Sequence, residues 1–263
     1  MLKKRPFIIA GPCVLESFEL ALSTALAVRE AAEAAGLAAV FKSSYDKANR
    51  SSVSGFRGPG QELGLEWLAR IREESGLPVL TDIHEREEAI LAAKTVDILQ
   101  IPALLSRQTS LLLAAGQTGR IVNIKKGQFL SPAEMRGSLE KVRSTGNGLV
   151  MATERGSSFG YNNLVVDMRS FGVMREFDAP LIMDATHAAQ LPGSLGGSSG
   201  GERRHVPILA RAAVAAGADG IFMECHPDPD RALCDGPNSL RLKDLPALLK
   251  TLSALWEVCR AGC

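Results

Sequence analysis

Eight short apolar runs alternate with helical patterns along the whole chain, and this alternation limits the folds open to it. The runs are rich in Val, Ile and Leu and end at Gly, Pro or polar residues. They read PFIIAGP, AAVFKSS, PVLTDIH, VDILQIPA, RIVNIKK, GLVMATE, APLIMDATH and GADGIFMECH. Runs of this kind are typical of parallel strands that are buried on both faces. The alternation therefore predicts a parallel α/β fold.

The segments between the runs carry the spacing of amphipathic helices. Residues 17–36 and 64–76 place apolar side chains at helical intervals and end on a glycine, and residues 205–217 and 242–260 follow the same pattern. Eight strand–helix units in 263 residues fit a (β/α)8 TIM barrel, which typically needs about 250 residues, better than a doubly wound sheet. No linker divides the chain, so we expect one catalytic domain over residues 1–263.

Charge and cysteine content narrow the function classes. A formal net charge of +1 gives no electrostatic argument for nucleic acid or a membrane surface as partner. Five scattered cysteines without a CxxC pair offer no disulfide framework and fit a reducing compartment. The apolar patch after the basic start is too short for a signal peptide, and no run is long enough to span a membrane. We expect a soluble cytoplasmic protein.

Polar side chains stand at the carboxyl end of nearly every predicted strand. Helix caps explain one or two such residues but not all of them, and the carboxyl ends of barrel strands form the face on which active sites are built. Two long loops, residues 45–62 and 188–204, follow strands on the same face, and we expect residues 193–201 to be a mobile cover. The strand-end residues are Cys13, Lys42, Lys47, Arg50, Asp82, His84, Gln100, Asn123, Lys125, Lys126, Glu154, Arg155, Asp184, His187, Glu224 and His226.

These residues divide into two chemistries. Lys42, Lys47, Arg50, Lys125 and Arg155 are cations from separate elements, and they predict an anionic ligand with phosphate or carboxylate groups rather than a surface salt-bridge mesh. The second group consists of metal-ligand residue types, but its spacing does not identify a metal site. Each residue also has a structural interpretation when taken singly: the histidine as a hydrogen-bonded loop residue, the glutamate as the partner of a lysine, and the cysteine as a core residue. The members of this group are Cys13, His187, Glu224 and Asp235.

Several long motifs resemble the 3-deoxy-D-manno-octulosonate 8-phosphate synthase family. They are AGPCVLES, FKSSYDKANRSS, RGPG, TDIHE, QIPALLSRQT, VNIKKGQFLSP, ERGSSFGYNNLVVDMRS, DATHAAQLPG and ECHPDPDRALCDGPNSL, and they cover about residues 7 to 250. The resemblance implies a (β/α)8 barrel, generally tetrameric, that condenses phosphoenolpyruvate with arabinose 5-phosphate and releases phosphate. Two alternatives stay open: the related seven-carbon synthase that uses erythrose 4-phosphate and carries KPR in place of KANRSS, and a non-catalytic phosphosugar-binding barrel.

The resemblance also implies roles for individual residues. Lys42, Lys47, Lys125 and Arg155 would hold phosphoenolpyruvate with Gln100 beside them; Asn49, Arg50 and Ser51 would hold arabinose 5-phosphate, and Arg107 would reach its phosphate from the neighbouring subunit. One class of the family has Asn at the position of Cys13 and uses no metal. The other class has Cys there and binds a divalent metal such as Zn²⁺, Fe²⁺ or Mn²⁺, here through Cys13, His187, Glu224 and Asp235. Cys225 follows Glu224 on a strand, so we expect it to face the opposite way, into packing.

Overall fold

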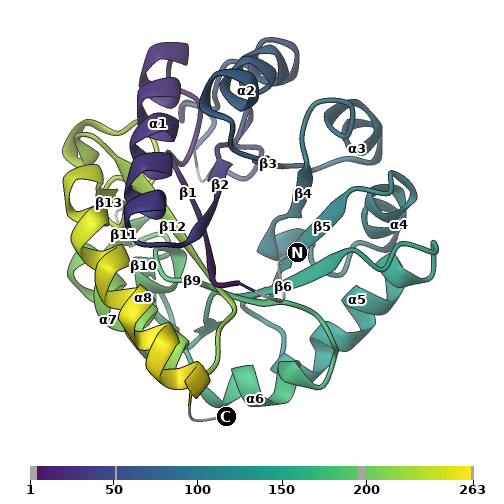
Figure 1. Cartoon of the computed structure of the whole chain (residues 1–263). Helices are drawn as coiled ribbons and strands as arrows, with labels where there is room; N and C mark the ends of the chain where they lie inside the picture. The colour runs from purple at the N-terminus through teal and green to yellow at the C-terminus, as the bar shows by residue number, and fades with distance from the viewer. Residues whose placement is uncertain (1–4, 51, 195–198, 262–263) are drawn as a thin grey trace.

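A closed barrel of parallel strands forms the centre of the computed structural model, which describes residues 5–50, 52–194 and 199–261 (Figure 1). Each strand pairs with the next, and the last pairs with the first, with Phe7 opposite Gly220 and Gly11 opposite Glu224. The predicted (β/α)8 TIM barrel is confirmed. Within the described residues its eight strands are β1 (Phe7–Gly11), β2 (Ala38–Lys42), β3 (Val79–Asp82), β4 (Ile98–Ile101), β5 (Ile121–Lys125), β6 (Val150–Glu154), β9 (Leu181–Asp184) and β12 (Gly220–His226).

Helices surround the barrel, as the ring of coiled ribbons in Figure 1 shows. The Ser17 side chain caps the first helix by accepting a hydrogen bond from the Leu20 backbone N–H. The second helix ends at Gly76, whose φ of 70° is the left-handed conformation that glycine adopts without strain. The α-helices are α1 (Phe18–Ala34), α2 (Gln61–Ser75), α3 (Arg86–Ala92), α4 (Thr109–Gln117), α5 (Met135–Arg143), α6 (Arg169–Arg175), α7 (Val206–Ala215) and α8 (Leu245–Ala261).

Alternate strand residues build two apolar layers, because successive side chains of a strand point to opposite faces. On β1, Ile8 and Ala10 pack outward against the helices, whereas Phe7 and Ile9 fill the barrel interior. The interior layer also takes one or two residues from most other strands and includes Phe222. These residues close the lower part of the barrel, so a site can form only above them, at the carboxyl ends of the strands. No helix among the described residues combines the length and apolar content that a membrane span requires.

Short elements cover the carboxyl face of the barrel. The strands are the hairpin β7 (Ser157–Ser158) and β8 (Leu164–Val165), the antiparallel pair β10 (Gln190–Leu191) and β11 (Gly200–Gly201), and β13 (Leu240–Arg241) beside β12. The single 3-10 turns are η1 (Ala103–Leu105), η2 (Pro132–Glu134), η3 (His187–Ala189), η4 (Arg203–His205), η5 (Pro229–Arg231) and η6 (Leu242–Asp244). The pair β10–β11 brackets the predicted cover, of which residues 195–198 lie outside the described residues, and its mobility stays a prediction.

Candidate active site

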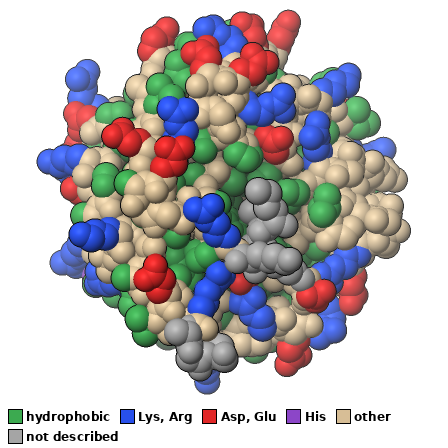
Figure 2. Space-filling model, in the orientation of Figure 1, with side chains coloured by type: hydrophobic (Ala, Val, Ile, Leu, Met, Phe, Trp, Pro, Cys, Tyr) green, Lys and Arg blue, Asp and Glu red, His purple; other side chains and the backbone are tan. Residues whose placement is uncertain are grey.

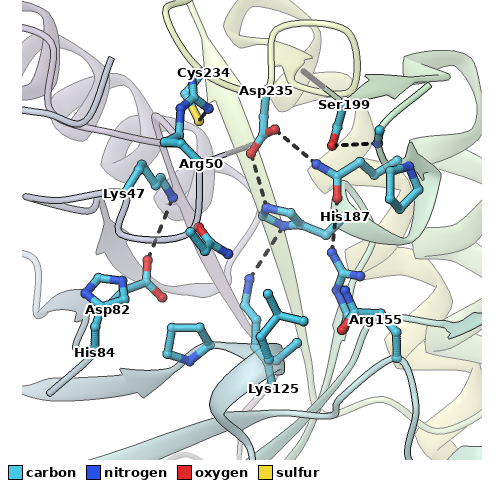
Figure 3. Close-up of a pocket in the computed structure, with 18 of the residues that line it drawn as sticks. Lys47, Arg50, Asp82, His84, Lys125, Arg155, His187, Ser199, Cys234 and Asp235 are labelled. Atoms are coloured by element: carbon cyan, nitrogen blue, oxygen red, sulfur yellow. Dashed lines mark hydrogen bonds and ion pairs between the residues drawn. The ribbon is translucent and has the colours of Figure 1, made fainter. Parts of the chain in front are cut away.

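A polar cavity of about 310 Å³ opens where the barrel strands end. Figure 2 shows basic side chains near the middle of this face, and Figure 3 shows side chains from several strands and loops converging in the cavity. The lining residues are Lys42, Lys47, Asn49, Arg50, Asp82, His84, Pro102, Ala103, Leu104, Lys125, Gln128, Arg155, His187, Gln190, Pro192, Gly193, Ser199, Cys234 and Asp235.

Lys42 is a buried cation at the end of β2, held by two neighbours. Its Nζ donates to Oε1 of Glu224 and to the Cys13 carbonyl oxygen, each at 2.9 Å. Burial acts most strongly and would lower the pKa of Lys42, but Glu224, Asp82 and Cys13 together outweigh it and the pKa is raised. Strands β1 and β2 lie close together at this point because residue 11 is glycine: a Cβ on Gly11 would lie 2.0 Å from the Lys42 carbonyl oxygen. Lys42 therefore stays charged inside the protein.

Asp82 lies between two of the cations. Its Oδ2 is 3.8 Å from Nζ of both Lys42 and Lys47, and the Ser44 hydroxyl donates a very short hydrogen bond to the same oxygen. Burial acts to raise the pKa of Asp82, but the two lysines lower it well below its usual range. The carboxylate is therefore ionised at any physiological pH and keeps both ammonium groups on this side of the cavity.

Below Asp82, a ladder of polar side chains crosses the barrel interior. Gln100 donates to Asp82 at 2.7 Å and accepts from Asn123 at 2.9 Å, and Asn123 in turn accepts from the Thr153 hydroxyl at 2.7 Å. Gln100 is fully buried and does not line the cavity. The structure thus assigns its amide to Asp82 and Asn123, and its predicted contact with phosphoenolpyruvate stays a prediction.

Lys125 and Arg155 supply the cations on the opposite side of the cavity. Lys125 Nζ lies 2.6 Å from Asp184 Oδ2 and 3.8 Å above the Phe222 ring. Burial lowers the pKa of Lys125 and of Arg155, and nearby carboxylates oppose this shift. Arg155 Nη1 is buried without a hydrogen-bond partner among the described residues. A buried guanidinium nitrogen without an acceptor in a cavity is a feature expected of an anion-binding site.

The residues predicted to hold the sugar phosphate differ in position. Asn49 and Arg50 line the cavity, and Arg50 donates to Cys234 Sγ at 3.0 Å and to the Leu233 carbonyl at 3.1 Å. Ser51 lies outside the described residues. Arg107 is not among the cavity residues; its side chain is 66% exposed and its Nη1 is 4.0 Å from Glu134 Oε1. All four roles stay predictions.

His187 is oriented as a metal-ligating histidine would be. Asp184 lies 2.8 Å from its Nδ1, while Nε2 faces Asp235 Oδ2 at 3.5 Å and Glu224 Oε1 at 3.6 Å. A carboxylate on one ring nitrogen commonly fixes the tautomer that presents the other nitrogen to a metal. Burial acts to lower the pKa of His187, but Asp184 and Glu224 raise it. The imidazole thus faces two carboxylates, one from strand β12 and one from the loop that follows it.

The four predicted ligands fall into two clusters that share Asp235. One contains His187, Glu224 and Asp235; the other contains Cys13, Cys234 and Asp235, with Cys13 Sγ 3.1 Å from Asp235 Oδ2 and 2.8 Å from Cys234 Sγ. Glu224 Oε2 is buried without a hydrogen-bond partner among the described residues. An orphaned carboxylate oxygen beside sulfur and imidazole donors fits a divalent metal.

The conformation and ionisation of this cluster also bear on metal binding. Asp235 has a φ of 49°, a left-handed conformation that costs free energy in a residue other than glycine and is common at functional sites. Burial raises the pKa of the Cys13 thiol well above its usual value, and the neighbouring Cys234 and Asp235 raise it further. A bound cation reverses this tendency because sulfur coordinates metals as thiolate.

Several features of the site carry no periodic signal in the sequence. Gln190 and Cys234 line the cavity and contact predicted site residues, yet single glutamine and cysteine residues in loops are not distinctive.

Two residues next to the site have structural roles instead. Lys126 follows Lys125 but is held by loop carbonyls, with Nζ 3.4 Å from Glu154, and it supports the loop after β5 from within. Cys225 is fully buried in the layer between barrel and helices.

Comparison with known proteins identifies the family of this barrel. The chain belongs to the DAHP synthetase I family, whose sequence profile matches residues 3–260. The particular group within the family follows from curated relatives, each named 2-dehydro-3-deoxyphosphooctonate aldolase. The protein of Nitratidesulfovibrio vulgaris (strain Hildenborough) is 68% identical over 98% of this chain and 94% of its own length. Those of Verminephrobacter eiseniae and Trichlorobacter lovleyi are 58% and 57% identical, over 97% and 96% of this chain and 91% and 93% of their own lengths.

Proposed function

We propose that this enzyme condenses phosphoenolpyruvate with arabinose 5-phosphate and water to give 3-deoxy-D-manno-octulosonate 8-phosphate and inorganic phosphate, for the synthesis of the Kdo sugar of lipopolysaccharide. The observation that carries the proposal is the ring of buried cations around one cavity, from Lys42, Lys47, Lys125 and Arg155. The relatives' printed name supports the same product, because an octonate has eight carbons. Three come from phosphoenolpyruvate and five must come from a pentose, so a four-carbon acceptor does not fit.

The four cations account for how phosphoenolpyruvate binds. Its carboxylate and phosphate need charged donors from two sides, which the Lys42–Lys47 pair and the Lys125–Arg155 pair supply across the cavity. Asn49, Arg50 and Ser51 hold the sugar phosphate in this proposal. Fixing both anions brings C3 of phosphoenolpyruvate next to the aldehyde carbon, and such positioning lowers the barrier by removing translational and rotational freedom beforehand. The lysine charges also stabilise the phosphate as it leaves.

The bond changes follow from the two substrates. C3 of phosphoenolpyruvate forms a bond to the aldehyde carbon of the sugar, whose oxygen takes up a proton and becomes a hydroxyl. Water adds at C2, and the resulting hemiketal phosphate breaks its C–O bond to release inorganic phosphate and leave the 2-keto group. Cys13, His187, Glu224 and Asp235 hold a divalent metal in this proposal, and such an ion supplies Lewis acidity toward the aldehyde oxygen or a water. Asp184 holds the His187 ring in place through Nδ1.

The proposal includes a homotetramer in which Arg107 serves a neighbouring active site. Leu104, Phe129, Phe159 and Tyr161 are 55%, 57%, 70% and 98% exposed on the loops after the adjacent strands β4, β5 and β6. Large apolar side chains exposed together beside a functional face are typical of a protein interface. Arg107 follows β4 on the same side, and its exposed guanidinium is available to a neighbour. The proposal places the enzyme in the cytoplasm, where the thiols of Cys13 and Cys234 stay reduced.

The decisive experiment measures phosphate release from phosphoenolpyruvate with each acceptor sugar. The purified full-length protein is assayed with arabinose 5-phosphate and with erythrose 4-phosphate, each with and without a chelator. We expect release with the pentose, poor release with the tetrose, and loss of activity with chelator that added Mn²⁺ or Zn²⁺ restores. Equal or greater turnover with erythrose 4-phosphate would overturn the proposed substrate, and full activity in chelator would overturn the metal.

A further inference from the structure

Gln190 joins the two halves of the site through a single side chain. It is the first residue of β10 and follows the η3 turn that carries His187. Its Oε1 accepts a hydrogen bond from Arg155 Nη2 at 3.2 Å, and its Nε2 donates to Asp235 Oδ1 at 3.1 Å; both bonds are drawn in Figure 3. One end of the amide therefore contacts a cation of the anion site, and the other contacts a carboxylate of the metal cluster.

At Asp235, the amide determines which oxygen is left for the metal cluster. Gln190 occupies Oδ1, while Oδ2 faces Cys13 Sγ at 3.1 Å and His187 Nε2 at 3.5 Å. Without the donated hydrogen bond, the carboxylate could rotate about its last torsion and exchange the two oxygens. Partners behind a ligating side chain commonly change metal affinity by about 10- to 100-fold.

At Arg155, the same amide holds one terminal nitrogen and leaves the other available. Nη2 donates to Gln190, whereas Nη1 is buried without a partner among the described residues. A guanidinium fixed in this way loses less conformational freedom when an anion binds than a free one. Only an amide provides both contacts here, since a carboxylate at this position has no hydrogen to donate to Asp235.

We propose that Gln190 is a positioning residue that couples metal binding to phosphoenolpyruvate binding. This inference rests on the proposed function, because it takes the ligand of Arg155 to be phosphoenolpyruvate and the ligand of Asp235 to be a divalent metal. A metal that fixes Asp235 also fixes the Gln190 amide, and the amide then holds Arg155 in the orientation that receives the anion. The effect is reciprocal by thermodynamic linkage: each ligand tightens the other by the same factor, typically about 5- to 150-fold.

The test measures this factor directly. Full-length protein is freed of metal with chelator and dialysed. Its affinity for phosphoenolpyruvate is then measured by calorimetry without metal and with saturating Mn²⁺. In parallel, free Mn²⁺ is followed by electron paramagnetic resonance with and without phosphoenolpyruvate. We expect Mn²⁺ to tighten phosphoenolpyruvate binding at least about 5-fold in the wild type, and the reverse titration to give the same factor.

Gln190→Met is the informative variant, because methionine keeps the length of the side chain but not the two strong hydrogen bonds. We expect its coupling factor to fall to about 1 and its Mn²⁺ affinity to drop by about 10-fold or more. Gln190→Leu serves if the methionine variant does not fold, as judged by circular dichroism. The matched control is Gln128→Met, since Gln128 lines the same cavity but its amide oxygen has no hydrogen-bond partner in the described part of the chain. Its coupling factor should stay at the wild-type value.

The outcomes separate this inference from the proposed function. A coupling factor unchanged in both Gln190 variants, or a factor of 1 in a wild-type protein that binds both ligands, would overturn the role of Gln190 alone. A factor that falls equally in Gln128→Met would also overturn it, because the bridge would then not be what matters. A wild-type protein that binds neither Mn²⁺ nor phosphoenolpyruvate would overturn the proposed function instead.

Discussion

Lys42 and Lys47 belong to the same cationic pair, yet the structure predicts very different losses of stability when each is changed to methionine. Lys42 is 1% exposed and donates two hydrogen bonds at 2.9 Å, one of them to Glu224, which is fully buried. Removing its charge takes from the buried Glu224 carboxylate its nearest cation, since His187 Nε2 is farther away at 3.6 Å, and breaking such a buried pair costs about 3–5 kcal/mol. Within residues 5–50, 52–194 and 199–261, the ammonium group of Lys47 makes one ion pair, at 3.8 Å with Asp82, and Asp82 keeps its bonds with Ser44 and Gln100. Its removal should cost about 1 kcal/mol or less.

The assay is urea unfolding of metal-free protein in chelator, followed by circular dichroism at one protein concentration. Lys42→Met should lower the unfolding midpoint far more than Lys47→Met, with similar slopes. Both variants should lose turnover, because both cations are proposed to hold phosphoenolpyruvate. The control is Lys42→Met combined with Glu224→Gln, which neutralises the orphaned carboxylate. This double variant should recover about 2 kcal/mol relative to the sum of the single changes. Equal destabilisation by Lys42→Met and Lys47→Met would refute the reasoning.

Three further outcomes follow from the site. Cys13→Ala should lose bound metal and activity but keep the fold, whereas Cys13→Asn should bind metal weakly and keep some chelator-resistant activity. Metal analysis and the phosphate-release assay check both outcomes. If Cys13 were only a core residue, neither substitution would change metal content or activity. Arg107→Ala should raise the KM for arabinose 5-phosphate about tenfold or more and leave the KM for phosphoenolpyruvate unchanged. Light scattering should show a tetramer, and a fully active monomer would contradict the role of Arg107 across an interface. The pKa of Asp82 is lowered in the folded state, so its stabilisation is complete above its unfolded value of about 3.9 and is lost as pH falls through the folded pKa. Asp82→Asn should therefore reduce the loss of stability on acidification between about pH 5 and pH 2, measured as urea midpoints against pH.

The barrel could be predicted from sequence because burial on both faces leaves a simple trace. Each strand reads as a short apolar run, and a polar residue such as Lys42 or Lys125 at its end marks the carboxyl face. This pattern predicts on which face of the barrel a side chain lies, but not which other side chain it contacts. Lys42 and Lys125 were expected to await an anion, yet each already has a buried carboxylate beside it, from Glu224 and Asp184 respectively.

The remaining parts of the site depend on where loops run and how side chains rotate. Cys13 and Asp235 are 222 positions apart, and nothing in their spacing indicates contact; the family resemblance named them, and closure of the barrel explains why they meet. Gln190 has no such signal, because its importance lies in which atom each end of the amide contacts. Gln100 shows the converse, since its place at a strand end indicated the face but not that its amide is already occupied by Asp82 and Asn123.

The junction between β1 and β12 has a consequence for how the protein is made. Cys13 follows the first strand, whereas Glu224 lies on the last and Asp235 just beyond it, so the metal cluster straddles the point where the two ends of the sheet meet. A ribosome must therefore synthesise the chain through Asp235 before a complete cluster exists. Nascent chains and fragments truncated before β12 cannot assemble it. In the proposed metal-bound enzyme, uptake of the ion therefore requires this junction to be closed, and removal of the ion should loosen the junction first.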